Sequence, residues 1–246
     1  MKKILLTILL LIIVGFVGCT ELKRAKVFLP HSWIGMRKVS DYLYVEKSMS
    51  QEDEQKIEDA IPKAKESLES IYKEVTTQPI IYACESQSCA NSLGLEGKVK
   101  GARLLGHLIL SNKIPYRNLI SHEWSHEELY ERIGGFWHWY REIPMWFDEG
   151  LASLTMKDYS RHDETAWQRV MEEKIPYPKQ KELISWNQWN QSCQTYLINE
   201  SIAVPYATAR HMVFKWYTKV GQRGLLELLE GIKNGEKFEE FYEKEK

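Results

Sequence analysis

Two histidines and a glutamate stand at the spacing of a metal site in the segment His122-Glu123-Trp124-Ser125-His126. Residues four apart in an α-helix leave the same face, so both imidazoles could grip one metal ion. Glu123 lies between them, close enough to take a proton from a water that the metal activates. The pattern predicts a hydrolytic zinc site. The plainer alternative is a pair of surface histidines on a polar helix.

A catalytic zinc generally takes three protein ligands and one water, so a third ligand must come from elsewhere in the chain. Glu149 follows in Trp-Phe-Asp-Glu-Gly-Leu-Ala (residues 146–152), and His138 stands in a Trp-His-Trp-Tyr run. A loop histidine between tryptophans is more often part of a packed wall than a ligand. Asp148 has two open interpretations: a partner that orients a ligand histidine, or an acid stabilised at a helix N-terminus.

Residues 118–155 resemble the gluzincin metallopeptidases, in which a second helix carries a glutamate ligand in a W-x-(N/D)-E-G-x-A setting. The resemblance implies that His122, His126 and Glu149 bind one Zn²⁺ and that Glu123 is the general base. It also implies that Tyr206, at the start of a C-terminal helix, stabilises the oxyanion. The glycine-rich signature of the aminopeptidase-type relatives is absent, so the resemblance favours an endopeptidase.

The elements that must position these residues indicate an α+β protein. The resemblance implies a zincin-like, thermolysin-type catalytic domain with a small mixed sheet, an active-site helix and a helical C-terminal part. Periodicity, proline and glycine signals support this order of elements. We expect a helix from Ser50 that Pro62 kinks or divides, strands over 79–84 and 102–110, a helix over 115–133, an aromatic loop over 136–140, and helices over 145–157, 201–220, 222–231 and 235–244.

The N-terminus reads as an export signal. Lys2 and Lys3 precede an apolar run over residues 4–14, and Cys19 follows a small residue. This arrangement resembles the lipobox of bacterial lipoproteins, which implies that residues 1–18 are a signal peptide removed before Cys19 is acylated. A retained membrane anchor and an ordinary cleaved signal are the alternatives. We expect residues 19–246 to form one domain, tied to a lipid bilayer in the bacterial cell envelope.

Composition excludes several classes of protein. The 246 residues are 43% hydrophobic and carry a formal net charge of −1, so a disordered chain and a nucleic-acid partner are not expected. In an oxidising envelope compartment, Cys84 and Cys89 are close enough in sequence to form a possible disulfide. Cys193 is then left over, and we favour a buried thiol over a reactive one.

These observations together predict a lipid-anchored, monomeric zinc metallopeptidase that acts on peptide or protein substrates. Two other functions remain open. One is a binding lipoprotein without catalysis that keeps zinc as a structural clip, although a clip has no use for the base Glu123. The other is a zinc amidase that acts on cell-wall cross-links rather than on proteins.

Overall fold

The computed structural model describes residues 19–97, 99–112, 115–157, 164–198 and 202–244. The predicted signal peptide, residues 1–18, therefore lies outside the described residues. The chain divides into two compact units, Met1–Lys56 with Pro79–Tyr116, and Ile57–Gln78 with Arg117–Lys246. The expected α+β class and small mixed sheet are confirmed. The single domain expected over residues 19–246 stays a prediction.

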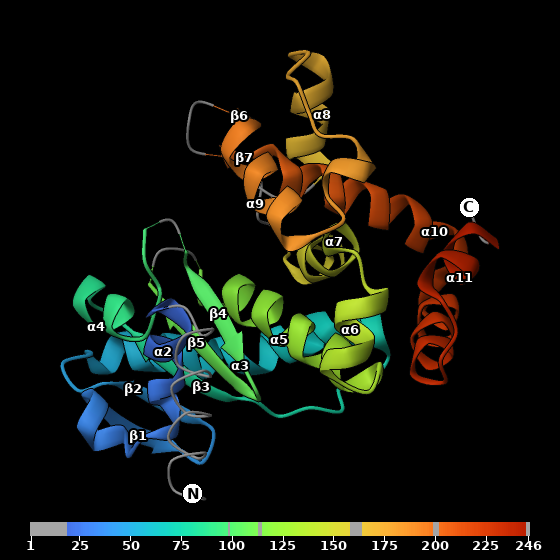
Figure 1. Cartoon of the computed structure of the whole chain (residues 1–246). Helices are drawn as coiled ribbons and strands as arrows, with labels where there is room; N and C mark the ends of the chain where they lie inside the picture. The colour runs from blue at the N-terminus through green and yellow to red at the C-terminus, as the bar shows by residue number, and fades with distance from the viewer. Residues whose placement is uncertain (1–18, 98, 113–114, 158–163, 199–201, 245–246) are drawn as a thin grey trace, which may run out of the picture. The chain divides into compact units, whose positions relative to one another are not determined.

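The first unit is built around a five-stranded mixed sheet (Figure 1). Its strand order is β1-β2-β3-β5-β4; the three inner strands run parallel, and each edge strand is antiparallel to its neighbour. A central parallel strand is buried on both faces, as the apolar run of β3 predicts. The elements are α2 (Cys19–Arg24), η1 (Ala25–Phe28), η2 (His31–Ile34), β1 (Met36–Ser40), β2 (Leu43–Glu46), β3 (Ile80–Cys84), α4 (Gln87–Ser92), β4 (Gly101–Leu104) and β5 (His107–Ser111).

The strand expected over residues 102–110 is instead a hairpin of β4 and β5, with Leu104 paired to His107. Leu105 and Gly106, with φ of 45° and 79°, form the two-residue turn. Two positive φ values suit the right-handed twist of a tight hairpin, and Leu is an unusual residue there. The sequence does not mark this turn, because Leu105 continues the apolar run of residues 102–110. In the structure Leu105 is nevertheless 61% exposed.

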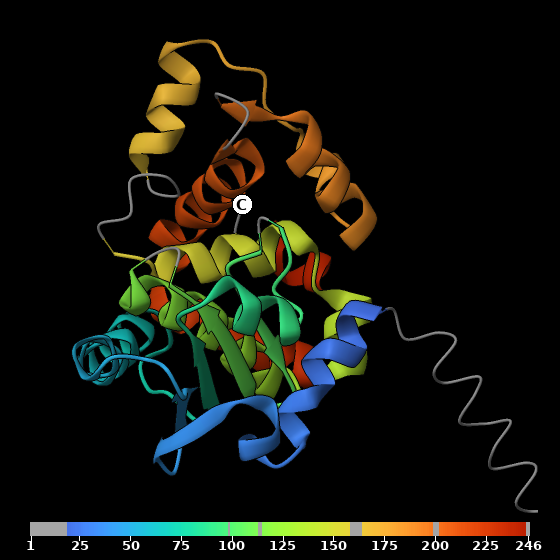
Figure 2. The same ribbon diagram turned by 90° about the vertical axis from the view of Figure 1, so that its left-hand side faces the viewer.

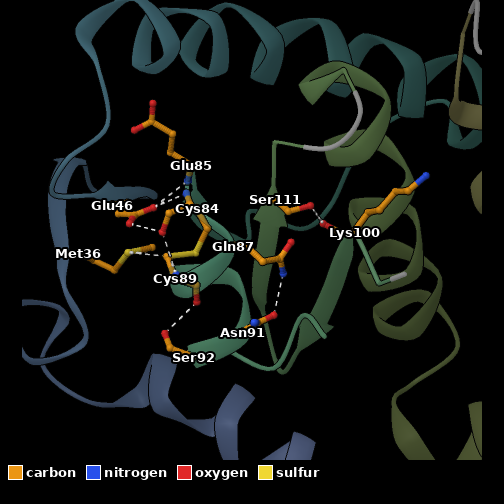
Figure 3. The surroundings of a disulfide bond; sticks show 11 residues. Met36, Glu46, Cys84, Glu85, Gln87, Cys89, Asn91, Ser92, Lys100 and Ser111 are labelled. Atoms are coloured by element: carbon orange, nitrogen blue, oxygen red, sulfur yellow. Dashed lines mark hydrogen bonds between the residues drawn. A yellow bond between two sulfur atoms is a disulfide. The ribbon is translucent and has the colours of Figure 1, made fainter. Parts of the chain in front are cut away.

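The disulfide expected between Cys84 and Cys89 is present, and it joins the end of β3 to α4 (Figure 3). Beside it the Glu46 carboxylate accepts hydrogen bonds from the backbone N–H groups of Glu85 and Ser86, at 2.9 and 2.7 Å, and from the Ser86 hydroxyl at 2.6 Å. The turn that carries the disulfide is therefore also tied to the end of β2.

Helix α3 (Gln51–Tyr72) begins where the sequence indicates, because the Ser50 hydroxyl accepts a hydrogen bond from the Asp53 backbone N–H at 3.1 Å. Pro62 does not divide the helix, which continues through it, so that part of the expectation is wrong. Pro62 lies on the exposed face, where water can satisfy the carbonyl that proline leaves without a helical partner.

The second unit is helical. It holds most of α3 and α5 (Tyr116–Arg132), α6 (Phe136–Glu142), α7 (Met145–Thr155), α8 (Glu164–Glu172), η3 (Gln180–Glu182), α9 (Trp186–Thr195), the short pair β6 (Leu197–Ile198) and β7 (Ile202–Ala203), α10 (Val204–Lys233) and α11 (Phe238–Lys244). Helices α8 and α9 flank the first part of α10, which lies against α7 (Figure 2). Two buried tryptophans, Trp146 and Trp216, lie in the core of the second unit. They pack with Phe147, Phe238 and Tyr242.

Helices α5 and α7 confirm the expected helices over 115–133 and 145–157 within a few residues. The break expected after residue 220 is also present, since Gly221 has φ 65° inside α10. The aromatic loop expected over 136–140 is wrong, because these residues form α6. Phe136 and Tyr140, one turn apart, stack at 5.8 Å, which supports a helix that propensity alone does not favour.

Gly150 permits a close approach between two helices of this unit. A Cβ at Gly150 would lie 2.5 Å from the Ala209 carbonyl oxygen and 2.6 Å from a methyl of Val213, so α7 meets the backbone of α10 there. Among the described residues, no helix combines the length and the apolar character that crossing a membrane demands.

Candidate metal centre

The three ligands implied by the resemblance converge in the second unit. His122 and His126 lie one turn apart on α5, and Glu149 comes from α7. The two histidine Nε2 atoms are 3.2 Å apart, and Glu149 Oε2 lies 3.3 Å from Nε2 of His122 and 3.9 Å from that of His126. Glu149 and His122 are buried and His126 is half-buried. This group could hold a metal ion.

The donor atoms fit a zinc ion. Atoms about 2.1 Å from a tetrahedral zinc are about 3.4 Å from one another, close to the separations of the three ligand atoms. Oε2 of Glu149 is buried and makes no hydrogen bond to the protein. A buried carboxylate oxygen needs a partner, and a cation at the focus of these atoms would provide one.

Asp148 contacts one of the three candidate ligands, His126, and it also lies in the first turn of α7, so the structure agrees with both of its interpretations. Its Oδ1 lies 2.5 Å from Nδ1 of His126, and its Oδ2 accepts a hydrogen bond from the Trp139 indole at 2.7 Å. A carboxylate on Nδ1 keeps the proton there and leaves the lone pair of Nε2 for a metal. Trp139 was missed from the sequence, because the aromatic run around it was expected to form a loop.

Electrostatics within the cluster are strong. Burial by itself lowers the pKa of His126, but the charge and hydrogen bond of Asp148, with the charges of Glu149 and Glu123, raise it to about 9. A metal at Nε2 therefore replaces a proton that the surrounding carboxylates hold. The same interaction places Glu123, which is buried beside His122 on α5, within the electrostatic reach of the site.

Tyr206 lies next to the ligands. It stands in the first turn of α10, its ring centroid is 6.3 Å from that of His122, and the Trp189 ring packs edge-on against it at 5.1 Å. The charge of Glu149, followed by burial, raises the pKa of Tyr206 well above its usual value. The phenol therefore keeps its proton and remains a hydrogen-bond donor at neutral pH.

Two other candidate residues take different places. His138 is in α6, where its Nδ1 lies 3.4 Å from the Gly134 carbonyl oxygen, and it is not one of the three grouped ligands. Cys193 on α9 is a free, half-buried cysteine. Burial, with the charge of Glu149, raises the pKa of Cys193 to about 12, so the site keeps it as a thiol.

The opposite side of α5 is fixed by a carboxylate that the sequence did not single out. Glu128 is fully buried and accepts hydrogen bonds from the backbone and hydroxyl groups of Thr76 and Thr77, at 2.8 to 3.0 Å, and from Arg132 at 2.6 Å. The Trp124 indole also donates to the Thr77 hydroxyl at 2.9 Å. These hydrogen bonds fix the helix that carries both histidines on the face opposite to them. The i,i+4 pair Glu128–Arg132 was the available sequence signal.

Comparisons with known proteins do not identify a family. No family model matches this chain, and no curated protein or solved structure matches it with significant similarity.

Proposed function

We propose that this protein is a zinc-dependent peptide-bond hydrolase, an endopeptidase of the gluzincin type with a zincin-like fold. The observation that carries the proposal is the convergence of His122, His126 and Glu149 from two helices, with ligand atoms 3.2 to 3.9 Å apart. The buried acid Glu123 beside this group favours a hydrolase over a structural zinc clip, because a clip needs no general base.

Each residue has a role in the proposed reaction. His122, His126 and Glu149 hold the ion, and Asp148 orients His126. A bound zinc ion would supply a Lewis acid that lowers the pKa of its bound water to about 7.

Glu123 accepts the proton of the attacking water and passes it to the leaving amine. Tyr206, which keeps its proton, donates a hydrogen bond to the developing oxyanion.

We also propose that the protein is a lipoprotein of the bacterial cell envelope, acylated at Cys19 and monomeric. The charged and apolar pattern of residues 2–18 supports export, and the disulfide between Cys84 and Cys89 is typical of an oxidising compartment.

Zinc content and hydrolysis in paired variants test the proposal. The wild-type protein should retain about one zinc per chain after dialysis, and Glu149→Ala should lose it, because a catalytic site needs three protein ligands. Glu123→Gln should keep the zinc and lose hydrolysis of a peptide library by at least about a hundredfold. Glu131→Gln, an exposed acid on the same helix, is the matched control and should change neither property.

The outcomes separate the possible functions. Full zinc retention in Glu149→Ala would mean that another residue is the third ligand, and no zinc in the wild type would refute the metallopeptidase. Cleavage of casein distinguishes a protease from an amidase, which would release fragments from peptidoglycan and leave casein intact. Zinc without either activity would favour the binding lipoprotein.

A further inference from the structure

Four large apolar side chains in the described structure are exposed directly after Cys19. Leu22 is 43% exposed, Phe28 55%, Leu29 46% and Trp33 78%. We call these four side chains the N-terminal apolar patch. Single exposed apolar residues are ordinary in soluble proteins, but these four lie within twelve residues of one another in the chain, next to Cys19.

The patch is displayed on a fixed framework. Val27 is buried between the exposed residues, and its carbonyl accepts a hydrogen bond from the Tyr82 hydroxyl at 3.0 Å. Helix α2 packs so closely on Gly94 that a Cβ there would lie 2.8 Å from a backbone oxygen of α2. Lys47 donates to the Ser32 carbonyl at 3.2 Å. Because these contacts all lie in the first unit, the apolar side chains project from a folded surface.

The short length of chain between Cys19 and the N-terminal apolar patch limits how far the patch can lie from the bilayer. Leu22 is three residues from Cys19, a distance of at most about 11 Å even for an extended chain. A lipid on Cys19, or a retained apolar anchor before it, holds that residue at the bilayer surface. Tryptophan and other large apolar side chains are the residues that favour the boundary between headgroups and acyl chains.

Charge should contribute less to membrane binding of this segment than apolar contact does. Residues 19–40 contain five Lys or Arg and one Glu, so this stretch has a net charge of +4 in a chain of −1. However, Lys23 pairs with Glu96, and Lys38 pairs with Asp41. These pairs reduce the attraction that a basic segment has for anionic lipid. We therefore expect binding to depend mainly on the apolar side chains.

We propose that the N-terminal apolar patch inserts into the interface of the lipid bilayer and so orients the first unit on the membrane. The inference rests on the proposed anchoring at Cys19. It differs from that anchoring because it assigns membrane contact to folded residues of α2, η1 and η2, which a simple tether would leave in water.

The test uses the full chain, reconstituted in vesicles of phosphatidylethanolamine and phosphatidylglycerol. Trp33→Cys, in a Cys193→Ser background, is labelled with an environment-sensitive fluorophore; at 78% exposure, position 33 tolerates the change. The matched control carries the label at Trp186→Cys, a tryptophan that is 56% exposed in the second unit. Flotation with the vesicles reports anchoring separately from the label.

We expect a blue shift and a several-fold gain in emission at position 33, quenched by brominated acyl chains, and no such change at position 186. Adding Phe28→Ser and Leu29→Ser should abolish the signal while the protein still floats with the vesicles. Flotation with position 33 in water would overturn the docking and keep the anchor. Failure to float would overturn both proposals. A blue shift that grows with protein concentration without vesicles would show self-association and overturn the bilayer as the partner.

Discussion

Asp148 and Trp139 fix the orientation of the His126 imidazole and would leave its Nε2 free for a metal. The carboxylate bridges the imidazole Nδ1 and the indole N–H, at 2.5 and 2.7 Å, and is only 4% exposed. Asp148→Ala should lower zinc affinity by about 10- to 100-fold, because the ligand loses its orienting partner. Competition with a chromophoric chelator measures the change. Trp139→Phe, which keeps the carboxylate, should have a smaller effect, and an unchanged affinity in Asp148→Ala would contradict the proposed role.

Tyr206 offers a test of the proposed oxyanion contact. Tyr206→Phe should lower kcat by about 10²- to 10³-fold and leave zinc content and KM nearly unchanged, because the hydroxyl acts on charge that develops in the transition state. Steady-state kinetics on a peptide substrate measure it. Tyr217→Phe is the matched control on the same helix, since the Tyr217 hydroxyl donates instead to the Ile71 carbonyl. Equal losses in both variants would indicate a packing effect.

Glu46 makes the stability of the first unit sensitive to acid. Burial raises its pKa, but the hydrogen bonds from Ser86 and Glu85 outweigh burial and hold the pKa of Glu46 below its usual 4.5. A lowered folded-state pKa means that the stabilisation is complete above about pH 5 and is lost as pH falls through the folded-state value. In urea titrations, Glu46→Gln should be less stable at pH 7, and the difference should shrink as pH falls toward about 3. A constant difference at all pH values would contradict this explanation.

At the scale of single residues, the sequence predicted the candidate ligands and the base better than the residues that orient them. His122, Glu123 and His126 are readable because a fixed spacing on a helix has a direct chemical meaning. The resemblance added Glu149, which the structure brings to the same point. Trp139 could not be predicted, because its indole reaches the site only through a contact between two helices, which no local pattern encodes.

Between elements, Gly150 controls how closely α7 and α10 pack, and these helices carry Glu149 and Tyr206. Helix propensity alone predicts that Gly150→Ala stabilises the protein by up to about 1 kcal/mol. The contact with the Ala209 carbonyl predicts the opposite sign, a loss of about 1 to 3 kcal/mol, with weaker zinc binding. Chemical denaturation measures whether Gly150→Ala raises or lowers the free energy of unfolding. Ala152→Gly in the same helix measures the cost of glycine together with the loss of one buried methyl, and a stabilised Gly150→Ala would refute the packing effect.

The long helix α5 and the buried strand β3 were predictable from the sequence, whereas the hairpin of β4 and β5 and helix α6 were not. Helix α5 begins directly after Pro115 and ends shortly before Gly134 and Gly135, so the proline and glycine signals of the sequence mark its limits. The hairpin of β4 and β5 turns at Leu105, a residue type that carries no turn signal, and α6 depends on aromatic stacking between Phe136 and Tyr140. In both cases contacts formed after folding decide the structure against the local preference.

At the scale of the whole molecule, the disulfide and the metal group belong to different units. Replacing both Cys84 and Cys89 by alanine should destabilise the first unit by about 2 kcal/mol, the loop-closure entropy of so short a loop. Zinc content should not change, because the ligands lie in the second unit. Urea denaturation and metal analysis measure the two effects, and reductant added to wild type should reproduce the first. Zinc lost together with the disulfide would contradict this separation.

The division into two units was not predictable, because no linker marks it. The chain leaves the first unit within α3 and returns to it at Pro79, so the boundary falls inside a helix of good capping and periodicity. Glycine- or proline-rich linkers, which usually reveal such boundaries, are absent at this point of the sequence.

Because the proposed ligands come from two helices, a bound ion is also a removable cross-link. It joins His126 to Glu149, 23 residues further along the chain, and binds only when α5 and α7 are docked. Free zinc at a hundred times the dissociation constant adds about 2.7 kcal/mol to the stability of the folded state. Without such an ion, the second unit would open more often and would be cut more readily by a protease. The lifetime of the protein would then vary with the supply of zinc.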